Sequence, residues 1–226
     1  MQRFGVKMVM FGGAGSGKTP TVNTAPRPLL LVVEPGLASM KGSTVPAFEA
    51  YTPQLVDEFF VWFFSSHEAK AYDTLAVDSI SQMAEIILTQ ELSRCKDGRM
   101  AYGEMSKRMM KHLNALFYMP QKHLALIGKQ CNLEVGTKTI AENGVFRVEP
   151  VRQKRIFFPG NDLDTKVPHM FDEVLHLDRV PIPGQGIQQA FRTREVPEIF
   201  ARDRSGNLAE YEPANLDYIF KKCMAA

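Results

Sequence analysis

Residues Gly12-Gly13-Ala14-Gly15-Ser16-Gly17-Lys18-Thr19 match the phosphate-binding pattern G-x-x-x-x-G-K-[ST] at every required position. The apolar run at residues 6–11 precedes this stretch as a strand would, so the glycines fall where a strand turns sharply into a helix. Without side chains in the way, successive backbone N–H groups can surround a phosphate, and the following helix adds the positive end of its dipole. We therefore expect these eight residues to bind a nucleotide rather than to form a turn that binds nothing.

The composition of the chain is that of a folded globular protein. Of its 226 residues 45% are hydrophobic and 23% are charged, which excludes a disordered or fibrous protein. The formal net charge of +2 is too small to indicate nucleic-acid binding by itself. Three cysteines without metal-ligand spacing indicate reduced thiols, and no apolar run approaches the ~20 residues of a membrane helix. We expect one domain over residues 1–226, located in the cytoplasm and without a membrane partner.

Strand-like and helical stretches alternate along the first half of the chain. This order is typical of an α/β fold, with a mainly parallel sheet and crossover helices. The strands are expected at 29–33, 74–79 and 123–128, and the helices at 18–25, 53–66, 80–93 and 103–118, with a loop at 94–103. The aromatic residues within 53–66 could stack on bases, although their helical spacing favours core or a subunit interface.

The second half is richer in polar residues and turns. Asn143-Gly144 lies between two strand-like runs, which predicts a hairpin insertion at about 132–150. Further strands, expected to be antiparallel, follow at 173–180, 188–196 and 199–204. Residues 213–223 are expected to form a helix opened by Pro213.

Two acidic residues follow predicted buried strands and could serve a nucleotide site. Asp78 ends the run Leu75-Ala76-Val77 and is expected to hold Mg²⁺ together with Thr19, although it could instead cap the next helix. Lys18 is expected to reach the β- and γ-phosphates. No acid follows Asp78 directly, so Glu34 is the best candidate for activating water, unless it is only a turn residue before Pro35-Gly36.

This set of residues resembles the core of RecA-like ATPases. The resemblance rests on Gly12–Thr19, Val33-Glu34, Val77-Asp78-Ser79 and the strand end at residues 127–130. It implies that the chain binds ATP and Mg²⁺, that Glu34 activates water, and that Gln130 senses the γ-phosphate.

The segment Ala201-Arg202-Asp203-Arg204-Ser205-Gly206 resembles the Lys-x-Arg-x-Gly signature of the same superfamily. There the two basic residues reach into the nucleotide site of a neighbouring subunit. The resemblance implies a homo-oligomer whose active sites are shared, with Arg202 or Arg204 acting across the interface. The alternative is a pair of solvated charges on an edge strand.

Taken over nearly its whole length, the chain is similar to the short phage RecA-like proteins of the Sak type. Besides the motifs above, the similarity rests on residues 31–36, on Phe171-Asp172-Glu173-Val174 and on residues 201–208. It implies a phage recombination ATPase in the host cytoplasm that binds single-stranded DNA and promotes annealing or strand pairing.

Basic residues are clustered in the two regions that follow the strands ending at Asp78 and Gln130. They could contact phosphates, with Tyr102 and Phe146 stacking on bases, or they could be solvated faces of helices and a hairpin. The residues are Arg94, Lys96, Arg99, Lys107, Arg108 and Lys111, then Lys138, Arg147, Arg152, Lys154 and Arg155.

The sequence leaves two alternatives to an oligomeric DNA-dependent ATPase. One is a nucleotide-gated binding module without catalysis. The other is a small-molecule P-loop kinase, for which the basic stretch at 94–111 would have to form a lid over the nucleotide. His112, His123 and His169 have no partners at ligand or triad spacing and are interpreted as structural.

Overall fold

The computed structural model describes residues 5–142, 145–160, 162–182, 184 and 186–225. Its strands form one sheet in the order β10-β8-β7-β1-β5-β4-β2-β3, while β6 pairs with β5 and β9 pairs with β7. The six strands from β7 to β3 in this order run parallel to one another. The parallel strands are β1 (Lys7–Gly12), β2 (Pro28–Val32), β3 (Ala47–Glu49), β4 (Thr74–Asp78), the first part of β5 (His123–Glu142) and β7 (Glu173–Ile182). The expected α/β class is thus confirmed.

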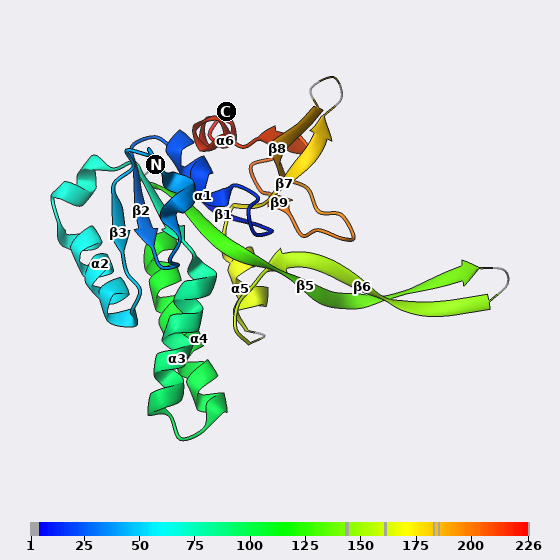
Figure 1. The fold of residues 1–226 in the computed structure, drawn as a ribbon, viewed down its shortest axis with the longest axis horizontal. Coiled ribbons are helices and arrows are strands. Elements are labelled where there is room, and N and C mark those ends of the chain that lie inside the picture. Colours follow the sequence, from blue (N-terminus) through cyan, green and yellow to red (C-terminus); the bar gives the residue numbers. More distant parts are fainter. Residues whose placement is uncertain (1–4, 143–144, 161, 183, 185, 226) are drawn as a thin grey trace.

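The central strands are buried on both faces, because their apolar residues alternate between two cores. In β1, Val9 and Phe11 point into one core and Met8 and Met10 into the other. Helices α2 (Pro53–Ser65), α3 (Ile80–Arg94), α4 (Gly98–Phe117) and α5 (Leu163–Met170) cover the first core, and α6 (Leu216–Cys223) covers the second (Figure 1). Most aromatic rings of α2 pack into the first core, as the favoured interpretation predicted.

Capping side chains set the helix boundaries, and some differ from those expected. The hydroxyl of Ser79 accepts the Gln82 N–H at 3.1 Å and starts α3. Asp97 accepts the Arg99 N–H at 3.0 Å and starts α4, so the loop expected at 94–103 is wrong and shrinks to 95–97. The helix expected at 18–25 is also too long, because α1 (Lys18–Thr21) tightens into a 3-10 turn over Val22–Thr24.

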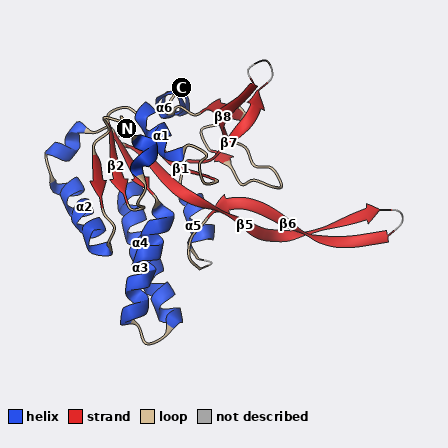
Figure 2. Cartoon of the chain, viewed as in Figure 1, coloured by secondary structure: helices blue, strands red, loops and turns tan. Residues whose placement is uncertain are grey.

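Strand β5 does not end with the parallel sheet. It continues past residue 128 and pairs antiparallel with β6 (Val145–Ile156), from Gln130 opposite Ile156 outward. We call residues 130–142 and 145–156 the β5–β6 arm; it extends far from the body of the protein (Figures 1 and 2). The hairpin expected at about 132–150 is therefore confirmed but longer, while the expected Asn143-Gly144 turn lies outside the described residues.

The C-terminal strands pair antiparallel with one another, as expected, but β7 also runs parallel to β1 and continues to Ile182, past the end expected at 180. β8 (Gly186–Arg192) pairs with β7 and β10 (Tyr211–Pro213), whereas the strand expected at 199–204 is reduced to β9 (Arg202–Asp203). The last helix begins at Leu216 because Asn215 accepts the Tyr218 N–H, and Pro213 ends β10 instead of opening the helix. Helix α5 was not predicted from the sequence; it contains Pro168.

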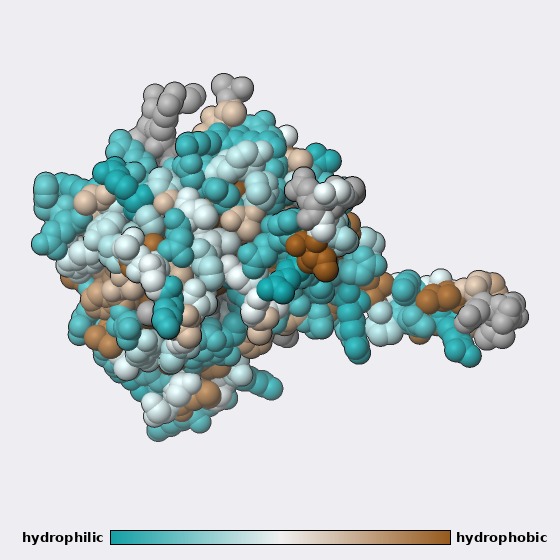
Figure 3. Space-filling model, turned by 45° about the horizontal axis from the view of Figure 1, so that its top comes forward, coloured by the Kyte–Doolittle hydropathy of each residue, from teal (hydrophilic) through white to brown (hydrophobic). Residues whose placement is uncertain are grey.

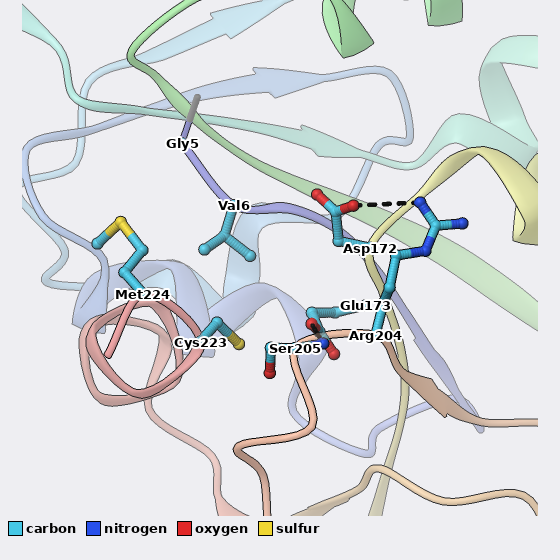
Figure 4. Close-up of a pocket in the computed structure, with 8 residues that line it drawn as sticks. All are labelled: Gly5, Val6, Asp172, Glu173, Arg204, Ser205, Cys223 and Met224. Carbon is cyan, nitrogen blue, oxygen red and sulfur yellow. Dashed lines mark hydrogen bonds and ion pairs between the residues drawn. The ribbon is translucent and has the colours of Figure 1, made fainter. Parts of the chain in front are cut away.

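A buried carboxyl group lies where β7 meets β9. Glu173 is only 1% exposed, and its Oε1 accepts the Ser205 N–H at 3.3 Å. Figure 4 shows it beside Ser205 and Cys223 in a hollow of about 300 Å³. Burial, reinforced by the nearby Asp203, raises the pKa of Glu173 from 4.5 to about 8.

Glu173→Gln tests this environment. A carboxyl whose pKa is raised on folding stabilises the folded chain fully below its unfolded pKa, and the contribution is lost as the pH rises through about 8. The melting temperature of Glu173→Gln relative to that of the parent should therefore rise between pH 5 and pH 8. Thermal melts across this range measure the difference, with the exposed Glu149→Gln as the control. A difference that does not change with pH would contradict the assignment.

Candidate nucleotide site

The Gly12–Thr19 loop joins β1 to α1. β1 is buried along its whole length, and the loop leaves it at Gly12. Gly15 and Gly17 have φ values of 73° and 92°, which residues with side chains rarely adopt. Lys18 Nζ donates to the carbonyl oxygens of Gly12 and Gly13, both at 2.9 Å, and so lies across the mouth of the loop. This is the strand–loop–helix geometry that the motif predicts.

Thr19 and Asp78 meet beside the loop. Asp78 ends β4, and its Oδ2 accepts the Thr19 hydroxyl at 2.5 Å. Burial raises the pKa of Asp78; the Thr19 hydrogen bond and the Lys18 charge oppose the shift, while Glu34 adds to it. One hydroxyl and one carboxylate suit Mg²⁺, which takes its remaining ligands from water and phosphates. Ser79 rather than Asp78 caps α3, so the alternative role for Asp78 is wrong.

Glu34 is held at the same end of the sheet. Its backbone N–H donates to the Asp78 carbonyl at 3.2 Å, and its Oε2 accepts the Ser79 hydroxyl at 3.1 Å. Lys18 faces both acids: burial lowers the pKa of Lys18, and the charges of Asp78 and Glu34 oppose that shift. Two hydrogen bonds, one to its backbone and one to its side chain, therefore hold Glu34 beside the end of β4.

Gln130 completes this group from β5. It lines a hollow of about 330 Å³ next to the Gly12–Thr19 loop, which we call the first hollow. The same hollow is lined by Gly12, Gly13, Ala14, Lys18, Glu34, Asp78, Ser79, Gly128 and Lys129. Of the expected catalytic and metal-binding residues, Lys18, Glu34, Asp78 and Gln130 thus line one hollow, and Thr19 is bonded to Asp78.

Two residues near the loop were not anticipated. His176 of β7 hydrogen-bonds the side chain of Gln130, and Gln189 of β8 donates to the Ser16 carbonyl at 2.8 Å. A Cβ added to Gly17 would lie 2.1 Å from Gln189 Nε2, so any other residue there would displace the Gln189 amide from the loop. Gln189 lines a second hollow of about 370 Å³ on the Thr19 side of the loop. Only strand pairing far along the chain brings these side chains here, so no motif signals them.

Arg202 and Arg204 do not lie near the loop of their own chain. They lie at or next to β9, which pairs with the first residues of β7, whereas the loop follows the last residue of β1. Arg204 forms an ion pair with Asp172 (Figure 4), with Nη1 3.3 Å from Oδ1, and its side chain is 43% exposed. The sheet therefore places these arginines and the loop at opposite ends.

The basic residues do not form one surface. The turn between α3 and α4, with Arg94, Lys96 and Arg99, lies far from the β5–β6 arm (Figure 1). Arg108 bonds Asp57 and Pro53 in the body of the protein. Several of the others are paired: Lys107 with Glu104, Arg152 with Glu134, Lys154 with Asp178, and Arg155 with the Phe200 ring. Tyr102 is on α4 and not on the arm.

Residues 5–205 match the family AAA_24, described as an AAA domain. Similar solved structures include a KaiC-like protein of the archaeon Pyrococcus horikoshii (14% identity, TM-score 0.47, 88% of this chain and 82% of the other). Another is the flagellar accessory protein FlaH of Methanocaldococcus jannaschii (10% identity, TM-score 0.40, 84% of this chain and 77% of the other). No curated protein matches, and no helix among the described residues could cross a membrane. With its complete phosphate-binding loop and mainly parallel sheet, the chain belongs to the AAA_24 family of AAA domains and is a P-loop nucleotide-binding protein of the ATPase type.

Proposed function

We propose that the protein binds ATP with Mg²⁺ and hydrolyses it. The observation that carries the proposal is the position of Glu34, which is fixed by Ser79 in the same hollow as Lys18 and Asp78. Hydrolysis of a γ-phosphate needs groups that bind the charged phosphates, a ligand for the metal ion and a group that orients the attacking water. The first hollow contains all three.

Each residue then has a separate role. The loop N–H groups and Lys18 bind the phosphates, while Thr19 and Asp78 hold Mg²⁺, which supplies charge stabilisation when bound. The Glu34 carboxylate accepts a hydrogen bond from the attacking water and takes its proton. The second hollow, past Thr19, has room for the nucleoside.

Glu34→Gln should retain ATP binding but lower turnover about 100-fold or more, because the amide cannot accept a proton. Phosphate release and equilibrium ATP binding measure the two effects. Lys18→Ala should lose both ATP binding and turnover. Glu49→Gln makes the same change of carboxylate to amide at the end of the neighbouring strand β3 and should retain both. Parent-like turnover in Glu34→Gln would refute its role. A parent protein that binds ATP without turnover would instead be the nucleotide-gated module.

We also propose that Arg202 or Arg204 completes the site of a neighbouring copy. Both lie at the far end of the sheet from the loop of their own chain, so they cannot act within it. Arg204 is partly exposed, and among the described residues only an exposed ion pair with Asp172 and one hydrogen bond to the His169 carbonyl hold its guanidinium.

Arg204→Ala should lower turnover in assembled protein, because the neighbouring phosphates lose a cation. Mixing Arg204→Ala with Lys18→Ala should restore part of the turnover, since one variant retains the loop and the other the arginine. Phosphate release across protein concentration measures this, with Arg204→Lys as the charge-retaining control. Parent-like turnover in assembled Arg204→Ala would exclude this residue, and the same design then applies to Arg202.

For the partner, we propose single-stranded DNA bound along the β5–β6 arm, as in phage strand annealing. Figure 3 shows the arm projecting from the body with both polar and apolar side chains on its surface. Phe146 is 75% exposed, and Lys138 and Arg147 have no ion pair among the described residues. The register places Phe146 on one face of the arm and Lys138 and Arg147 on the other, so the ring suits a stacked base and the cations suit phosphates of a strand that passes around the arm.

Phe146→Ala should weaken binding of an oligo-dT strand about 5-fold or more, since stacking contributes ~1–3 kcal/mol per base. In the double variant Lys138→Ala/Arg147→Ala, the slope of log K against the logarithm of the salt concentration should become less steep by about 1.4. Each lost phosphate contact accounts for ~0.7 of that change. Fluorescence anisotropy at several salt concentrations measures both. Lys96→Ala with Arg99→Ala, at the α3–α4 turn, is the matched control. Arm variants that bind like the parent would remove the arm from the DNA site.

A further inference from the structure

A buried histidine contacts Gln130, the residue that the RecA-like resemblance assigns to the γ-phosphate. His176 Nε2 lies 2.9 Å from Gln130 Oε1, although 46 residues separate them in the chain. His176 is 1% exposed on β7, opposite Phe11 of β1, and its ring centroid is 5.1 Å from that of Phe11. The imidazole is therefore fixed by strand pairing and packing, whereas Gln130 is only half-buried.

The protonation state of His176 decides which atom donates in its hydrogen bond with Gln130. Burial, with smaller contributions from Lys154, Arg192 and Lys18, lowers its pKa to about 4, and Asp178 only partly opposes this. The ring is therefore neutral at physiological pH and carries one N–H. Because an amide oxygen accepts, Nε2 must donate, and Nδ1 is then a buried acceptor with no partner among the described residues.

Packing alone does not call for a histidine at this position. A phenylalanine of similar size would fill the place beside Phe11 without leaving a buried nitrogen unpaired, which costs stability. The donated hydrogen bond is what the imidazole adds. It occupies the amide oxygen of Gln130, so the amide NH₂ group remains available to donate to another acceptor.

We propose that His176 is a positioning residue for Gln130, holding its amide so that the NH₂ group donates to the γ-phosphate. The inference rests on the proposed function, in which the first hollow receives that phosphate. An ordered donor favours ATP over ADP, because only ATP offers the acceptor. Without His176 the amide rotates freely and can present its oxygen to the phosphate, which weakens the preference.

The test is the ratio of affinities for a slowly hydrolysed ATP analogue and for ADP. His176→Phe retains the ring beside Phe11 and removes the donor, so the ratio should fall about 5-fold, the effect of a ~1 kcal/mol hydrogen bond. Gln130→Ala should lower the ratio at least as much. The double variant should match Gln130→Ala alone, because His176 acts only through Gln130.

Two further variants separate positioning from folding. His112→Phe makes the same change at a buried histidine stacked on Phe60 in the first core, and it should leave the ratio unchanged. His176→Gln retains an N–H donor and should recover part of the ratio. If His176→Phe does not fold, His176→Leu, which also removes the donor, alone and combined with Gln130→Ala gives the same cycle.

A ratio unchanged in His176→Phe, or further lowered in the double variant, would overturn the inference. Binding is measured without turnover, so failure of the proposed hydrolysis remains distinguishable. A parent protein that lacks ATPase activity refutes the hydrolysis alone. An unchanged ratio in His176→Phe, with turnover lost in Glu34→Gln, refutes only the role of His176.

Discussion

The register of the parallel strands is the constraint on which the rest of the site depends. Gly12 pairs with Lys129, and Asp78 pairs with both Val32 and Ile127, so β1, β2 and β4 end at the edge where β5 leaves the parallel sheet. A shift of one residue in any strand would turn its alternating apolar side chains to the wrong core. The burial of Met8, Val9 and their neighbours thus fixes the positions of Lys18, Glu34 and Asp78 as well.

Two acidic side chains, Asp78 and Glu34, and one basic side chain, Lys18, lie close together at this edge. Burial raises the pKa of Asp78 and lowers that of Lys18, while each group favours the charged form of the other. Hydrogen bonds from Thr19 and Ser79 keep the two carboxylates in place. Phosphate oxygens and a divalent cation would satisfy these same groups.

The antiparallel half of the protein surrounds this edge and extends beyond it. The β5–β6 arm begins at Gln130, and β7 and β8 bring His176 and Gln189 to the loop. Arg202 and Arg204 lie at the other end of β7, away from the loop. One sheet therefore carries the phosphate-binding loop at one end and two arginines at the other.

The sequence by itself determined the α/β class and the phosphate-binding loop, and it predicted that Lys18, Thr19, Glu34, Asp78 and Gln130 serve one site, where the structure places them together. Glycine spacing, apolar runs and the acid at a strand end are local signals, and the edge rule of parallel sheets brings them together. Helix ends were less predictable, because Asp97 and Asn215 act as caps only in the folded chain. The tertiary structure alone decided the contacts of His176, Gln189 and Arg204, since pairing between distant strands has no local signal. It also decided the length of the arm, which depends on β6 continuing its ladder with β5 back to Ile156.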